Sequence, residues 1–172
     1  MAKSRKTAAA TPALSVLTAA HVEYSTHKFV AGDDHFGAQA AKQLAGLGFQ
    51  PQQVMKTLLL VEVTTDPHPR YGLCCVAVTD KVSLKAAAKV FGWSKAALAP
   101  ANATARITGY IPGGVSPLGG KQQLPVVFDT LPCSFATVCV SAGKRGMDVA
   151  LAPQDLVAAS GGSIADIAVH GG

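Results

Sequence analysis

The stretch from Thr108 to Gly120 is rich in residues that can place main-chain N–H groups around a negatively charged oxygen. It contains five glycines and two prolines. Glycines allow a ligand to approach the backbone closely, and successive N–H groups can then bind an oxyanion. It is not a Walker loop, because no Gly-Lys-Ser/Thr follows, and it is not a dinucleotide fingerprint either. The same composition also suits an ordinary surface loop. An oxyanion-binding site and a surface loop without function are therefore the two possible interpretations.

Lys56 is a second candidate, because it begins a run of apolar residues that extends to Val61. A cation at the mouth of a pocket could hold a carbonyl oxygen or a phosphate. Alternatively, its stem packs at the end of a strand while its ammonium group reaches water. Thr57 is expected on the other side of the strand, unless a local irregularity turns both side chains inward.

The third candidate region runs from Val140 to Asp148, where a predicted strand enters a tight turn with adjacent cations at Lys144 and Arg145. These cations could contact phosphates, although a solvated hairpin tip explains them equally well. Asp148 could accept a hydrogen bond from a substrate or pair with Arg145.

Metal and protein-nucleophile chemistry have no recognisable motif. The five histidines lack the spacing of a helical metal pair, and no Gly-x-Ser-x-Gly elbow occurs. The four cysteines fit neither a zinc site nor a disulfide framework, and Cys74 and Cys75 should point to opposite faces of a strand. We therefore expect reduced, mostly buried thiols and no metal or cofactor.

Length and composition predict one domain. The chain has 172 residues, of which 49% are hydrophobic and 15% charged. Residues 1–10 resemble a loose basic tail, and residues 11–172 form the expected domain. A net charge of +5 supports a polyanionic partner only weakly. No segment has the roughly 18 apolar residues of a membrane span, so we expect a cytoplasmic protein.

The elements that must position these residues are helices and strands without a regular alternation, which predicts an α+β fold with a mixed sheet. Caps and breakers place the helices. The first begins at Pro12 after Thr11, the second follows Asp34 as its cap, and Ser83 caps another that Gly92 ends. The predicted helices cover residues 12–20, 35–44, 83–91, 102–108 and 153–159. The predicted strands cover residues 22–25, 54–63, 73–78, 126–129, 136–140 and 149–151, with a short last element at 164–169.

In order and context, these features resemble the YbaK/EbsC family over about residues 11–168. The segments that carry the resemblance are Thr11-Pro12-Ala13, His35-Phe36-Gly37, Lys56-Thr57-Leu58-Leu59, Thr108-Gly109-Tyr110, Gly113-Gly114-Val115-Ser116-Pro117-Leu118-Gly119, Val140-Ser141 and Gly143-Lys144-Arg145-Gly146. Among these, the Gly-Gly-x-Ser-Pro-Leu-Gly segment after an upstream Lys-Thr-Leu is the most specific.

The resemblance implies a mixed sheet curled into a barrel with helices outside. It also implies an enzyme that hydrolyses mischarged Cys-tRNA(Pro), related to the editing domain of prolyl-tRNA synthetase. In such enzymes the cysteine thiol of the substrate attacks the ester carbonyl of the same cysteine, and the cysteinyl group is released from the tRNA as a thiolactone. The implied partners are the acceptor end of tRNA(Pro) and prolyl-tRNA synthetase.

By the same resemblance, Lys56 anchors the substrate, and the backbone amides of Gly113 and Gly114 stabilise the oxyanion. The implied substrate-binding residues are Phe29, Thr57, Ser116, Ser141 and Asp148. Phe29 is a departure, since the family often has a tyrosine there and a phenyl ring cannot donate a hydrogen bond. Pro112 is a second departure. A deacylase for another mischarged tRNA, such as Ala-tRNA, and a binding module without catalysis are the alternatives.

Overall fold

The structure, a computed structural model, describes residues 11–30, 32 and 36–170. The predicted basic tail, residues 1–10, and the predicted cap Asp34 lie outside the described residues. None of the helices in the described part of the chain combines the length and the apolar character of a membrane span.

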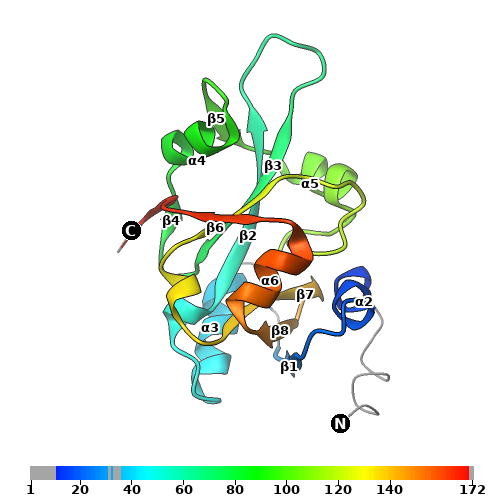
Figure 1. Cartoon of the computed structure of the whole chain (residues 1–172), viewed down its shortest axis with the longest axis vertical. Coiled ribbons are helices and arrows are strands. Elements are labelled where there is room, and N and C mark those ends of the chain that lie inside the picture. Colours follow the sequence, from blue (N-terminus) through cyan, green and yellow to red (C-terminus); the bar gives the residue numbers. More distant parts are fainter. Residues whose placement is uncertain (1–10, 31, 33–35, 171–172) are drawn as a thin grey trace.

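Helices and strands are interspersed along the chain (Figure 1). The α-helices are α2 (Pro12–Ala19), α3 (Phe36–Ala45), α4 (Leu84–Phe91), α5 (Ala101–Thr108) and α6 (Pro153–Ser160), and two short 3-10 turns are η1 (Pro51–Gln53) and η2 (Pro132–Ser134). The strands are β1 (Ser25–Lys28), β2 (Met55–Glu62), β3 (Tyr71–Ala77), β4 (Lys81–Val82), β5 (Ala96–Leu98), β6 (Val126–Asp129), β7 (Val138–Lys144), β8 (Met147–Leu151), β9 (Ser163–Ala165) and β10 (Ala168–Val169).

The strands form three hydrogen-bonded sheets. The largest has the order β5-β2-β3-β6-β9, in which β3, β6 and β9 run parallel and the other pairs are antiparallel. A second sheet has the order β1-β8-β7, and β10 pairs with β4. The mixed α+β fold is therefore confirmed. The expected barrel is not, because the pairings of the described strands leave these sheets separate, joined only by a parallel bridge between Val54 and Cys139.

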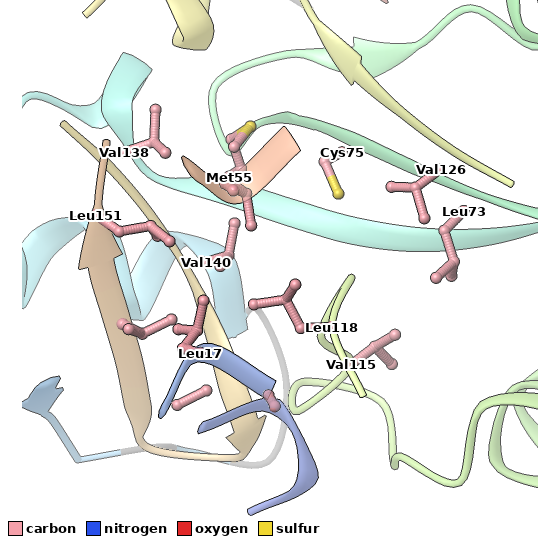
Figure 2. Close-up of a cluster of buried hydrophobic side chains, with 14 of the residues drawn as sticks. Leu17, Met55, Leu73, Cys75, Val115, Leu118, Val126, Val138, Val140 and Leu151 are labelled. Carbon is pink, nitrogen blue, oxygen red and sulfur yellow. The ribbon is translucent and has the colours of Figure 1, made fainter. Parts of the chain in front are cut away.

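The main core fills the space between the two larger sheets and includes side chains from α2 and from the glycine-rich loop. Figure 2 shows Leu17, Met55, Val140 and Leu118 in this cluster, drawn from four different parts of the chain. Cys75 belongs to the same cluster, whereas Cys74 packs into a second cluster on the opposite face of β3. The expected opposite orientation of the two thiols is confirmed, and both cysteines are free and buried.

Local sequence signals explain most of the element boundaries. Thr11 caps α2 by accepting a hydrogen bond from the Leu14 amide, and Ser83 does the same for α4 at Ala86. Gly92 ends α4 in the left-handed conformation that glycine adopts without strain. These predicted starts and stops are confirmed.

Three predicted strands differ from the structure. The strand expected at 22–25 is wrong in position, because the Val22 amide instead donates to the Leu17 carbonyl and closes α2, so β1 starts only at Ser25. The strand expected from residue 136 begins at Val138, and the last element divides into β9 and β10.

Candidate active site

A pocket of about 390 Å³ lies where the two larger sheets meet. Its walls come from segments that are distant in the sequence: the start of β2, the end of β5, α3, α5, the glycine-rich loop and the β7–β8 pair. Its lining residues are Phe29, Gly37, Ala40, Val54, Met55, Lys56, Thr57, Leu58, Leu59, Val78, Leu98, Ala99, Ala101, Thr104, Pro112, Gly113, Val115, Ser141 and Asp148.

The pocket borders an open edge of β2. On one side, β2 pairs with β3 from Met55 to Val61 without interruption. On the other side, β5 pairs with it only from Leu60, and β7 meets it only at the bridge to Val54. Of the described strands, none pairs with residues 56–58 on that side, so main-chain groups of this segment can face a ligand.

This open edge explains why both Lys56 and Thr57 line the pocket. Consecutive residues of a strand point to opposite faces, and the continuous pairing with β3 shows no irregularity that would turn them to the same face. Thr57 indeed points toward the main core, where its Oγ1 lies 3.4 Å from the Cys75 Sγ. Because the pocket wraps around the strand edge, side chains of both faces border it.

Lys56 is half-buried, and no described residue forms an ion pair with it. Burial lowers the pKa of its ammonium group, the charge of Asp80 opposes this, and the charge of Lys81 lowers the pKa further. An unpaired and partly desolvated cation at the wall of a pocket is suited to bind an oxygen with negative charge.

The glycine-rich loop brings Gly113 to the pocket but not Gly114. Gly113 has a φ of 85°, in the left-handed region. The Gly114 amide donates to the Ile111 carbonyl at 2.8 Å, and a Cβ at Gly114 would lie 3.0 Å from backbone atoms of Lys144 and Arg145. Gly114 therefore permits the loop to lie against the β7–β8 turn, while its N–H is already used within the loop.

Ser116 also lies outside the pocket lining. It is fully buried, and its Oγ accepts a hydrogen bond from the Leu118 amide at 3.2 Å. Val115 and Leu118 on either side of it are anchored in the core. The loop is thus held by apolar contacts and internal hydrogen bonds rather than exposed as an idle surface loop.

The β7–β8 pair contributes Ser141 and Asp148, which face each other in the strand register. The register shifts between Ser141 and Lys144, and the Ser141 Oγ accepts a hydrogen bond from the Gly143 amide. The cation of the adjoining turn, Arg145, donates from Nε to the Pro112 carbonyl at 2.8 Å and so ties the turn to the glycine-rich loop.

Asp148 is 5% exposed, and no described group donates a hydrogen bond to its carboxyl group. Burial raises the pKa of this carboxyl to about 7. A pairing with Arg145 would lower the pKa instead, and the carboxyl borders the pocket, where a ligand can reach it. A buried carboxyl that borders a pocket and has no protein donor is ready to accept one from a substrate.

An apolar wall completes the pocket, and Phe29 is the one residue of this wall for which a functional role was predicted. Phe29 follows β1, where its amide donates to the Gly146 carbonyl, and Ala40, Val54 and Val78 pack in the same cluster. Gly37 lies one helical turn before Ala40, and a Cβ there would come within 2.9 Å of Val78. Small residues at this helical spacing are the signal that could have located the wall.

The described residues contain one group with metal-ligand character, and none of its three members lines the pocket. Ligand atoms of Asp80, Asp129 and His170 lie within 4.8 Å of one another. His170 Nδ1 lies 2.7 Å from Asp80, while Asp129 accepts the amides of Ile167 and Leu131. These contacts hold the end of the chain against the β3–β4 turn.

Comparisons with known proteins agree with one another. The family model for the aminoacyl-tRNA editing domain matches residues 37–159. EbsC of Enterococcus faecalis is 32% identical over 167 residues, which are 97% of this chain and 98% of that protein; a Cys-tRNA(Pro)/Cys-tRNA(Cys) deacylase activity is assigned to EbsC by inference.

Two solved structures share the fold. One is a proposed trans-editing enzyme for prolyl-tRNA synthetase, with 22% identity and a TM-score of 0.72, covering 90% of this chain and 91% of that one. The other is the hypothetical protein APE2540, with 21% identity and a TM-score of 0.77, covering 92% and 99%.

Proposed function

This chain belongs to the aminoacyl-tRNA editing domain family, and we propose that it is a trans-acting deacylase that removes cysteine from mischarged Cys-tRNA(Pro). The similarity to EbsC over nearly the full length supports this substrate. We also propose that residues 11–172 act as one domain, that the enzyme works in the cytoplasm, and that prolyl-tRNA synthetase supplies part of the selection for tRNA(Pro).

The observation that carries the proposal is a pocket that brings a cation without an ion-pair partner close to loop backbone, and whose described residues include no Ser-His or Cys-His pair. Lys56 and Gly113 lie at its wall, and among the described residues its lining includes neither histidine nor cysteine. The described cysteines are buried apart from Cys133, which is partly exposed, and burial raises their pKa. Neutral thiols are weak nucleophiles.

The substrate can supply the missing nucleophile. In Cys-tRNA(Pro), the thiol sulfur attacks the ester carbonyl carbon, the new S–C bond forms, and the bond from that carbon to the ribose oxygen breaks. The thiol proton passes to the departing ribose oxygen, so the products are a cyclic thiolactone and tRNA with a free hydroxyl. Such a reaction needs a protein that fixes the attack geometry and stabilises the oxyanion.

Each pocket residue has a place in this scheme. Lys56 and the backbone at Gly113 bind the carbonyl oxygen as negative charge develops on it. Asp148, in its ionised form, binds the amino group of the cysteine, and Ser141 and Thr57 offer hydroxyls to the terminal ribose. Gly114 and Ser116 hold the loop in place.

The wall formed by Phe29, Ala40, Val54 and Val78 favours alanine as a second candidate substrate. It offers the side chain of the substrate only apolar contact, and apolar pockets discriminate small differences in size by about 1–3 kcal/mol. A methyl side chain therefore fits as a thiol does, but alanine has no attacking group.

Rates of deacylation of Cys-tRNA(Pro) and Ala-tRNA(Pro) distinguish these possibilities. We expect turnover of Cys-tRNA(Pro) and little of Ala-tRNA(Pro). Equal turnover of both would assign a general hydrolytic mechanism, and no release of either amino acid would leave a binding module without catalysis.

A further inference from the structure

The positive charge of this chain is concentrated in residues 81–128. This stretch contains no Asp or Glu and six cations, which are Lys81, Lys85, Lys89, Lys95, Arg106 and Lys121. The whole chain has 15 cations and 10 acids, so the remaining residues hold nine cations and ten acids, a net charge of −1. The excess positive charge therefore lies in the stretch that forms β4, α4, β5 and α5.

Three of these cations surround a hollow between α4 and β5. Its lining includes Lys85 and Lys89, one turn apart on α4, and Lys95 just before β5. We call these three residues the lysine hollow. All three side chains are exposed, and no described residue forms an ion pair with any of them.

The floor of the hollow is rigid. Trp93 is 7% exposed and stacks on Phe91 with ring centroids 4.6 Å apart. Ala87 and Ala88 of α4 are buried in the second core cluster, and Ala88 also borders the hollow between Lys85 and Lys89. Lys85 and Lys89 are therefore held on a helix that is fixed by its packing, and Lys95 is held beside them at the start of β5.

The lysine hollow and the candidate active site share β5. Ala96 lines the hollow, and Leu98, two residues further along the strand, lines the pocket. At about 3.3 Å per residue, the Cα atoms of these two lining residues are separated along β5 by about 7 Å. Figure 1 shows α4 beside β5, on the side of the β2–β3 hairpin opposite α5. A nucleic acid whose terminal nucleotide enters the pocket can thus place its preceding phosphates at the hollow.

We propose that the lysine hollow binds backbone phosphates of the acceptor end of the aminoacyl-tRNA. This inference deepens the proposed function and rests on it, because it names the surface that receives the tRNA beyond the aminoacyl group. Lysine acts as a point charge toward phosphate, and such contacts position a nucleic acid without reading its sequence. The hollow contributes affinity for any tRNA and no preference for tRNA(Pro).

The test is the triple variant Lys85→Ala/Lys89→Ala/Lys95→Ala. If each lysine meets one phosphate, the slope of log Kd for uncharged tRNA(Pro) against log salt concentration falls by about 2, at about 0.7 per phosphate of a single strand. On the same basis, we expect Kd for uncharged tRNA and KM for Cys-tRNA(Pro) to rise by about tenfold or more at moderate salt. Turnover of 3′-cysteinyl-adenosine, which lacks these phosphates, should stay within about twofold of the wild type.

A matched control removes three cations elsewhere, with Lys28→Ala/Lys42→Ala/Lys121→Ala. We expect its tRNA affinity to change much less than that of the first variant. An equal loss in both variants would show that net charge alone matters and would overturn the proposal, as would unchanged tRNA binding in the first variant. Thermal unfolding checks that both variants fold. Should the triple variant not fold, the single changes Lys85→Gln, Lys89→Gln and Lys95→Gln each decide the question through the same salt slope.

The outcomes also separate this inference from the proposed function. If the wild-type protein releases no cysteine from Cys-tRNA(Pro), the proposed function fails, whereas tRNA binding by the two variants still tests the surface. If deacylation occurs and the lysine hollow variant binds tRNA as the wild type does, only the surface is wrong.

Discussion

At the residue scale, burial acts on the two charged groups of the pocket in opposite directions. It lowers the pKa of the Lys56 ammonium and raises that of the Asp148 carboxyl to about 7. Neither group has an ion-pair partner among the described residues. A substrate that brings an oxyanion to one and an amino group to the other supplies the missing partners, in a site where screening by water is weaker than at the surface.

Lys56→Met tests the role of the cation while it retains most of the apolar stem. Removal of one group that stabilises an oxyanion typically lowers kcat by about 10²–10³, and we expect kcat/KM for Cys-tRNA(Pro) to fall to that extent. Lys42→Met, on α3 and outside the pocket lining, is the control and should keep wild-type activity. Wild-type kinetics in Lys56→Met, with unaltered thermal unfolding, would reduce Lys56 to a packing role.

Asp148→Asn tests whether ionisation of the buried carboxyl destabilises the folded protein. The pKa of this carboxyl in the folded state lies above its ordinary value of 3.8, so the folded protein binds the proton more tightly than the unfolded chain. The stability that this group contributes is then fully present below about pH 4 and is lost as the pH rises toward about 7. We expect the free energy of unfolding of Asp148→Asn, relative to wild type, to increase between pH 4 and pH 8. Parallel pH profiles would show that Asp148 ionises normally.

At the element scale, the sequence predicted the helix ends that capping residues and breakers determine. It did not predict the short strands that form only by pairing with other strands. Thr11, Ser83 and Gly92 marked helix ends correctly because their side chains or φ preferences act locally. The two-residue β4 and three-residue β5 have no alternation to reveal them, since they exist only by pairing with β10 and β2. The missed β5 is the strand that leaves the edge of β2 open at the pocket.

The glycines of the loop also have roles that depend on tertiary packing and could not be predicted from the sequence. Their number predicted a loop, but not which of them face a ligand and which admit neighbouring backbone. Gly119 has a φ of 69°, and a Cβ there would lie 2.5 Å from the carbonyl carbon of Pro12 at the start of α2. Such a contact depends on the tertiary packing of α2 against the loop and leaves no trace in local sequence.

Gly119→Ala is therefore expected to destabilise the fold. The left-handed conformation costs an alanine about 1 kcal/mol, and displacing the packed backbone of α2 adds about 1–3 kcal/mol. In the matched change Gly120→Ala, the new Cβ meets its nearest neighbours only at 3.5 Å, and the change should be nearly neutral. Urea unfolding of both variants measures the difference in the free energy of unfolding. Equal stability would show that the loop does not pack tightly against α2.

At the scale of the whole molecule, the candidate site exists only where separate sheets meet. Phe29, Lys56, Gly113 and Asp148 come from β-sheet and loop segments far apart in the chain. The family resemblance predicted that these residues share one site. Their spacing along the chain could not predict this, because they are far apart in the sequence. It did not reveal the open edge of β2 or the apolar wall, which depend on where pairing stops and on small side chains such as Gly37.

The central claim is that the substrate provides its own nucleophile, and the most direct measurement is the identity of the first product released from Cys-tRNA(Pro). Mass spectrometry of the quenched reaction should find the cysteine thiolactone before free cysteine accumulates. Free cysteine as the first product, with one oxygen derived from isotopically labelled water, would contradict the account and place an attacking water in the pocket.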